Sequence, residues 1–150
     1  MDDRNSGSSR VGRLEGTVLS RLLLDTTFFV DAERSKESLD DAIDDDDDIA
    51  VAAITLAELL VGVELSKGNT RVGRQGLVDD IVASVPIIDY DLSVARAHSQ
   101  LLVAVRKQGR PRGAHDLIIA ASALSSNRVV VTADQTAFMD LPGLIAVFHR

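Results

Sequence analysis

Short apolar runs alternate with longer helical patterns along the chain, and this alternation limits the fold more than any other feature. Runs typical of buried strands occupy residues 21–25, 49–54, 86–89, 128–132 and 144–148. Helical patterns occupy residues 31–43, 55–67, 72–83, 91–108 and 114–125. Strands that alternate with helices form βαβ units, which give a parallel sheet with helices on both faces. The sequence therefore predicts a three-layer α/β domain.

Length and composition place the chain among ordinary soluble domains. Its 150 residues predict a single domain over residues 21–150, preceded by a polar segment, residues 1–20, that we expect to be a mobile tail. The absence of cysteine excludes disulfides, thiolate metal ligands and cysteine nucleophiles. No apolar run is long enough to span a bilayer, and residues 1–20 lack the apolar stretch of a signal peptide. We expect a cytoplasmic protein without a membrane partner.

The net charge of −7 is unevenly distributed. Acids concentrate in the first ninety residues, whereas basic side chains gather just ahead of Asp116, at Arg106, Lys107, Arg110 and Arg112. A basic strip beside an acidic centre is typical of a nuclease, because phosphates need cations and metals need carboxylates. The alternative is a solvated helix end whose cations complement the helix dipole.

Four acids occupy corresponding places in the expected fold. Asp25 ends the first strand, and Asp134 follows the strand that ends at Thr132. Glu58 and Asp116 stand in the first turns of two expected helices. The carboxyl ends of parallel strands share one edge, where crossover helices begin and ligand sites form. The sequence thus predicts that four carboxylates converge in one cleft.

Each acid also has a purely local interpretation. Asp25 is placed to cap the turn that follows it, and Thr55 to Glu58 matches a capping box. Asp116 is placed to favour a helix dipole, and Asp134 to begin an Asx turn. The sequence does not decide between these interpretations for any single residue.

The joint pattern favours a metal site. Apolar residues follow Glu58 and Asp116 directly, so we expect their carboxylates to be partly desolvated. Mutual repulsion would make a bare cluster of such groups costly, and a divalent cation removes that cost. Oxygen ligands without cysteine or clustered histidine indicate Mg²⁺ or Mn²⁺ rather than Zn²⁺.

Each of the four acids lies in a short characteristic segment. The segments are Leu24-Asp25-Thr26-Thr27, Thr55-Leu56-Ala57-Glu58-Leu59, His115-Asp116-Leu117-Ile118-Ile119-Ala120-Ala121 and Val131-Thr132-Ala133-Asp134. Together they resemble the signatures of PIN-domain nucleases, and most closely those of VapC-type toxins from bacterial toxin–antitoxin pairs. The resemblance covers residues 21–148 in the right order and spacing. It implies a PIN-like α/β/α domain with four to five parallel strands, usually as a homodimer.

The resemblance also implies a function. It predicts Mg²⁺- or Mn²⁺-dependent endonuclease action on structured RNA of the translation machinery, blocked by a cognate VapB-type antitoxin. The family's acidic positions match Asp25, Glu58, Asp116 and Asp134, and its supporting hydroxyl positions match Thr26 and Thr132. One departure stands out. Ala137 occupies a place where family members often have another acid.

Roles for the side chains follow from metal-assisted phosphoryl transfer. Asp25, Asp116 and Asp134 are the expected metal-holding residues, and Glu58 is expected to orient or deprotonate the attacking water. Arg110 and Arg112 are candidates for contact with RNA phosphates or with the antitoxin.

Two histidines are left outside the predicted site. We expect His98 to be a packed or edge residue of its helix, since it lies among apolar neighbours. We leave out His115 because adjacent helical residues, here His115 and Asp116, point apart.

Three other classes of protein are alternatives to an active nuclease. A receiver-type signalling module would have an acidic pair after the first strand and a late lysine, but residues 108–150 contain no lysine. A phosphatase with an aspartyl nucleophile usually has a second Asp two residues later, where Thr27 stands. A PIN fold kept for partner or DNA binding, with its nuclease activity lost, stays open because of Ala137.

Overall fold

The computed structural model describes residues 21–35, 44, 46–134 and 136–148. The predicted tail, residues 1–20, lies outside these ranges. Five strands form one sheet in the order β3-β2-β1-β4-β5, and every pairing is parallel. The strands are β1 (Arg21–Leu24), β2 (Asp48–Ala52), β3 (Ile87–Ile88), β4 (Val129–Thr132) and β5 (Ala146–Phe148). The predicted parallel α/β fold is confirmed.

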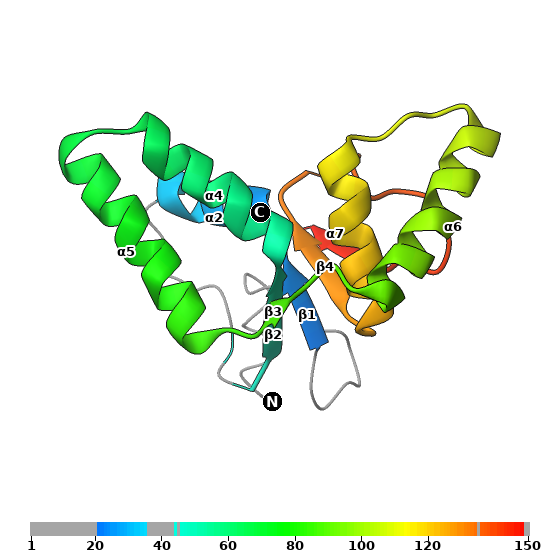
Figure 1. Cartoon of the computed structure of the whole chain (residues 1–150), viewed down its shortest axis with the longest axis horizontal. Coiled ribbons are helices and arrows are strands. Elements are labelled where there is room, and N and C mark those ends of the chain that lie inside the picture. Colours follow the sequence, from blue (N-terminus) through cyan, green and yellow to red (C-terminus); the bar gives the residue numbers. More distant parts are fainter. Residues whose placement is uncertain (1–20, 36–43, 45, 135, 149–150) are drawn as a thin grey trace, which may run out of the picture.

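Helices cover both faces of the sheet in the part of the chain that the structure describes (Figure 1). They are α2 (Thr26–Ser35), α4 (Ala53–Leu65), α5 (Gly68–Ser84), α6 (Leu92–Gln108) and α7 (Ala114–Ser125). Side chains alternate along each strand, so neighbouring strand residues belong to different cores. Leu22 and Leu24 pack with α2, α4 and α5, whereas Leu23 packs with α6 and α7. This is the three-layer arrangement that the alternation of apolar runs predicts.

Three expected helix boundaries are wrong. Helix α2 begins at Thr26 rather than at residue 31, because Asp25 caps it by accepting the Phe28 amide N–H at 3.0 Å. Residues 36–43, the rest of that expected helix, lie outside the described ranges. Helix α4 begins at Ala53, two residues before the expected Thr55, and α5 begins at Gly68, four residues before the expected residue 72. Tertiary burial of Thr55, which is fully buried, outweighs its preference for a cap.

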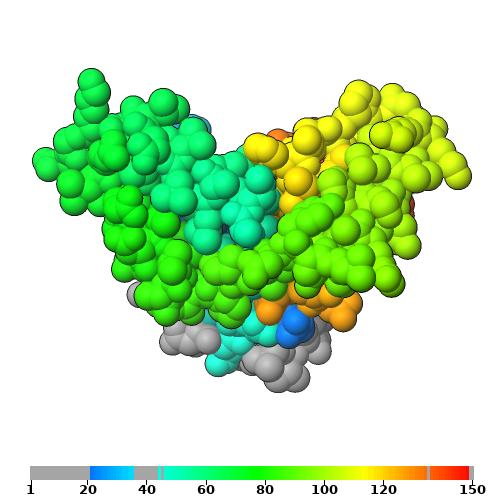
Figure 2. Space-filling model, viewed as in Figure 1, coloured from blue at the N-terminus to red at the C-terminus, as the bar shows by residue number. Residues whose placement is uncertain are grey.

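The strand order places a topological switch point at the centre of the sheet. From β1 the chain adds β2 and β3 on one side and later β4 and β5 on the other. The carboxyl ends of β1 and β4, which pair directly, therefore mark the position where open α/β sheets bind ligands. The space-filling view shows the molecule notched between the helix pair α4–α5 and the helix pair α6–α7 (Figure 2). This notch separates the helices that carry Glu58 and Asp116.

Within the described ranges, none of the helices combines the length and the apolar character that crossing a membrane requires.

Candidate active site

Asp25 lies at the centre of the site, at the carboxyl end of β1, and is 2% exposed. Its two carboxylate oxygens accept hydrogen bonds from the Thr27 hydroxyl at 2.8 and 3.0 Å. The Thr132 hydroxyl donates to Oδ2 at 2.8 Å, and the Phe28 amide donates to Oδ1. Burial raises the pKa of this carboxyl above its ordinary value, although the hydrogen bonds from Thr132, Thr27 and Phe28 oppose the rise. Asp25 is thus both a helix cap and a constrained acid.

A pair of threonines fastens the ends of β1 and β4 together. The Thr27 and Thr132 hydroxyls lie 3.1 Å apart, and the Ala133 amide donates to Thr27 at 2.9 Å. The Asp134 amide donates to the Thr132 hydroxyl at 2.9 Å. Thr132 therefore lies where the family resemblance predicts a supporting hydroxyl. Thr27 has an equally central position, which sequence reasoning missed. The sequence signal for Thr27 was its position two residues after Asp25, where a hydroxyl can bond to a carboxylate that begins a turn.

Glu58 reaches the site from α4 and is held on both sides. The Thr26 hydroxyl donates to Oε1, and the His115 imidazole Nδ1 lies 2.8 Å from Oε2. The capping-box interpretation is wrong, because α4 begins at Ala53 and its N-cap, Ala52, makes no side-chain capping bond. His115, which lies outside the predicted catalytic set, contacts that set through Glu58. Adjacent helical side chains do point apart, and His115 thereby points at Glu58.

Asp116, near the start of α7, is the least hydrogen-bonded acid of the group. Among the described residues, none donates a hydrogen bond to its carboxylate. Burial raises its pKa, and the charges of Asp25, Asp134 and Glu58 raise it further, while His115 opposes them. The four predicted acids are therefore close enough to influence one another electrostatically. The predicted convergence at one edge of the sheet is what the fold brings about.

Asp134 follows β4, and its two carboxylate oxygens have different roles. Its Oδ1 accepts the Thr136 amide at 3.1 Å, the Thr136 hydroxyl at 3.0 Å and the Ala137 amide at 3.3 Å. This is the Asx-turn geometry that the sequence allowed. Its Oδ2 receives no hydrogen bond from the described part of the chain. One oxygen therefore shapes the loop and the other remains available to a ligand.

An open pocket of about 480 Å³ joins Asp116 and Asp134 to the basic loop. Its lining also includes Arg110, Arg112 and Ala137. The Arg110 guanidinium pairs with Asp140 at 3.0 Å and remains half-exposed. The Arg112 guanidinium donates to the carbonyl oxygens of Arg110 and Met139, at 2.7 and 2.6 Å. Arg112 thus orders the pocket wall, whereas Arg110 stands at its rim.

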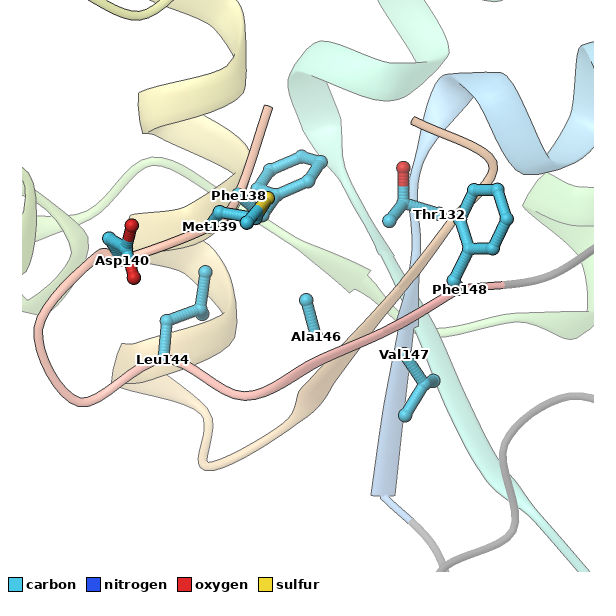
Figure 3. A pocket seen from close by; sticks show the side chains of 8 residues that line it. All are labelled: Thr132, Phe138, Met139, Asp140, Leu144, Ala146, Val147 and Phe148. Atoms are coloured by element: carbon cyan, nitrogen blue, oxygen red, sulfur yellow. The ribbon is translucent and has the colours of Figure 1, made fainter. Parts of the chain in front are cut away.

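A second pocket, of about 430 Å³, lies beside β5 (Figure 3). Phe138, Met139 and Leu144 line it on one side, and Phe148 stands next to Thr132 on the other. Its lining is mostly apolar, and Asp140 supplies its carboxylate. Because it lacks a cluster of converging polar groups, the acidic pocket is the better candidate for chemistry.

His98 lies apart from the acids, as the sequence predicts. Its Nδ1 lies 2.8 Å from the Tyr90 hydroxyl, and the two rings pack edge to face. Both residues come from the α6 region, so this pair belongs to the edge of a helix.

The donor set fits a cation that keeps much of its water. Within the described residues, no group of three or more His, Asp or Glu side chains is arranged so that it could hold a metal ion, so any cation would rest on fewer carboxylates. Mg²⁺ is commonly bound through one or two carboxylates with several waters retained, and carboxylate oxygens are its preferred protein ligands. Asp116 and the Oδ2 atom of Asp134 satisfy that requirement. Burial, and after it repulsion from Asp25, Asp134 and Glu58, raises the pKa of Asp116, and a bound cation would offset that repulsion.

Comparison with known proteins decides the family. A family model described as the PIN domain matches residues 22–143. The chain belongs to the PIN-domain family. Ribonuclease VapC5 of Mycobacterium tuberculosis is 35% identical over 126 residues, which are 83% of this chain and 90% of that protein. The tRNA(fMet)-specific endonuclease VapC of Shigella flexneri is 30% identical over 96 residues, which are 64% of this chain and 71% of that protein.

Solved structures agree with this assignment. VapBC2 from Rickettsia felis, bound to a promoter DNA fragment, superposes on this PIN domain with a TM-score of 0.71 and 27% identity. The match covers 85% of this chain and 98% of that one. VapBC-5 from Mycobacterium tuberculosis, a member of a toxin–antitoxin family, gives a TM-score of 0.69 and 30% identity, over 87% of this chain and 98% of that one. The family resemblance expected from the four motifs is confirmed.

Proposed function

We propose that this PIN domain is a metal-dependent endoribonuclease toxin of the VapC type, which cleaves structured cellular RNA and so inhibits translation. The observation that carries the proposal is the group of four mutually influencing carboxylates at the switch point of the sheet. Perturbed acids in a cleft are typical of catalytic sites. The ribonuclease and endonuclease names of relatives matched over most of this chain support the choice of RNA.

The carboxylates differ in how many hydrogen bonds they already accept from the protein. In the part of the chain that the structure describes, no group donates to the Asp116 carboxylate or to Asp134 Oδ2, so we assign these oxygens direct contact with Mg²⁺ or Mn²⁺. Asp25 accepts hydrogen bonds at both oxygens and takes part through remaining lone pairs or a bridging water. The bound cation would supply Lewis-acid polarisation of a phosphoryl oxygen and a more acidic water. Thr27 and Thr132 keep Asp25 in place.

Glu58 acts on the attacking water. Its two oxygens are oriented by Thr26 and His115, and each keeps a further lone pair for a water molecule. A carboxylate fixed in this way orients the water or accepts its proton, which removes the need for a covalent enzyme intermediate. Thr26 is therefore a supporting residue of the water-binding side of the site.

The basic loop provides the contacts outside the reacting centre. We assign Arg110 to a phosphate that flanks the cleaved bond, because its guanidinium is half-exposed at the rim and its pairing with Asp140 is exchangeable. Arg112 keeps the wall of the pocket in shape through its contacts with two carbonyl oxygens. Both side chains also lie where a cognate antitoxin that covers the pocket would contact them.

A VapB-type antitoxin is the proposed regulatory partner, and a homodimer is the proposed assembly. The solved VapBC structures with high TM-scores are the support for the antitoxin. Helix α4 presents apolar side chains outward at Leu60, Val61 and Leu65, which are 39, 56 and 80% exposed. Such an exposed apolar helix face is typical of a protein that associates with others.

The test is RNA cleavage by the wild type and by Asp25→Asn, each with Mg²⁺, Mn²⁺ or EDTA, after circular dichroism shows both folded. We expect metal-dependent cleavage by the wild type and a loss of about 10³-fold in the variant, equivalent to about 4 kcal/mol of transition-state stabilisation. Equal cleavage by both proteins would indicate a contaminating ribonuclease and would contradict the proposal. No cleavage by either would favour the alternative, a PIN fold retained for antitoxin, DNA or other partner binding.

A further inference from the structure

The contact between His115 and Glu58 links helices α4 and α7 across the active site. Glu58 belongs to α4 and His115 to the first turn of α7, and these helices lie on the two sides of the notch (Figure 2). The 2.8 Å separation between Nδ1 and Oε2 spans 57 residues of sequence. The Glu58 side chain is 30% exposed and that of His115 is 55% exposed. The pair therefore lies at the accessible surface of the site rather than in the core.

Glu58 needs an external restraint to hold one geometry. Its side chain has three rotatable bonds, and ordering such a side chain has an entropic cost. The Thr26 hydroxyl restrains only Oε1, which leaves rotation of the carboxylate open. A donor on Oε2 removes that rotation. The imidazole is suited to this task because it is a rigid ring on a short side chain.

We propose that His115 is a positioning residue of this active site, which fixes the Glu58 carboxylate across the notch in one orientation toward the attacking water. This inference rests on the proposed function and adds to it a residue outside the four acids. The neutral or charged ring must carry its proton on Nδ1 to donate to Glu58. Hydrogen-bond partners that orient the ligands of a metal site typically contribute about 10- to 100-fold in affinity or activity, and we expect an effect at the lower end of that range for a residue that orients Glu58.

A set of three variants tests the positioning role by cleavage. His115→Ala removes the donor, whereas His115→Asn retains an amide nitrogen near the place of Nδ1. The matched control is His98→Ala, which removes a histidine that also bonds through Nδ1 but lies at Tyr90. We expect His115→Ala to lower kcat about tenfold with little change in KM. We expect His115→Asn to recover most of that loss and His98→Ala to cut like the wild type.

Nuclear magnetic resonance of the imidazole nitrogens provides a readout that needs no cleavage. We expect His115 to be protonated on Nδ1 in the wild type and to lose that preference in Glu58→Ala. If the wild type shows no metal-dependent cleavage, the proposed function fails while this measurement still decides whether the pair exists. Unchanged His115 resonances in Glu58→Ala would overturn the inference, as would equal cleavage by His115→Ala and the wild type. Equally poor cleavage by His115→Ala and His115→Asn would also overturn it.

Discussion

The two ends of the central strands differ in whether their acidic side chains have basic partners. At the amino end, Asp48 pairs with the Arg21 guanidinium at 2.8 Å and with that of Arg128 at 3.0 Å. The Arg128 side chain, only 7% exposed, also donates to the carbonyl oxygens of Asp48 and Leu22. At the carboxyl end, four carboxylates influence one another, and the His115 imidazole contacts Glu58. Among the described residues, no Arg or Lys side chain forms an ion pair with any of those four.

The difference separates structural charge from functional charge. The negative charge of Asp48 is compensated by two guanidinium groups of the protein itself. The acids at the carboxyl end have no guanidinium or ammonium partner among the described residues. Burial raises the pKa of both Asp25 and Asp116, and repulsion from neighbouring carboxylates adds to the rise. Groups held in such a state are stabilised by a ligand of opposite charge. The protein thus compensates the acidic charge at the amino end of the sheet, whereas the acidic charge at the carboxyl end is left for a cation to compensate.

The largest effect that would test this contrast is a stability loss confined to the amino end. Asp48→Asn removes the charge that the nearly buried Arg128 faces, so we expect the free energy of unfolding to fall by about 1–3 kcal/mol. Cleavage per folded molecule should be unchanged. Denaturant unfolding measures the first quantity, with the exposed Asp80→Asn as a control that should lie within about 0.5 kcal/mol of the wild type. A cleavage defect in Asp48→Asn would break the comparison.

A smaller effect at the carboxyl end comes from Gly113. A Cβ atom built on Gly113 would lie 3.0 Å from Asp116 Oδ2, so alanine there must displace the carboxylate. We expect Gly113→Ala to lower cleavage about tenfold, equivalent to about 1.4 kcal/mol, because small misplacements of a reacting group are costly. The φ of −60° at Gly113 suits alanine, so stability should change little. Gly73→Ala, where no atom lies within 4 Å, is the control and should cut normally.

The smallest effect concerns the pH dependence of stability without metal. Because the folded-state pKa of Asp116 is raised, its favourable contribution exists at low pH and is lost as pH rises through that pKa. In EDTA at pH 7.5, Asp116→Asn should therefore melt a few degrees above the wild type, and the difference should vanish below the ordinary aspartate range. The gain is modest because the partly exposed carboxylate is screened by solvent. A scan in which Mn²⁺ raises the Tm of both proteins equally would contradict the role of Asp116.

Sequence patterns predicted the fold and the four acids, because both depend on local information. The apolar run that ends at Asp25 and the β-branched run that ends at Thr132 are short, and helical patterns separate them. Parallel pairing then follows from the connections alone, and it brings strand ends to one edge. Boundaries were less predictable. The capping preference of Thr55 competed with its burial, and burial moved the start of α4 to Ala53.

What the sequence determined by itself was the strand–helix alternation and the placement of Asp25, Glu58, Asp116 and Asp134 at one edge. Only the tertiary structure decided which oxygens are occupied and which are open. It brought His115 to Glu58, 57 residues away in the chain, and within the described residues it placed no donor at Asp134 Oδ2, although Oδ1 is held by the local turn. Hydrogen bonds between distant elements depend on the packing of α4 against α7 and of β1 against β4. No local pattern encodes that geometry.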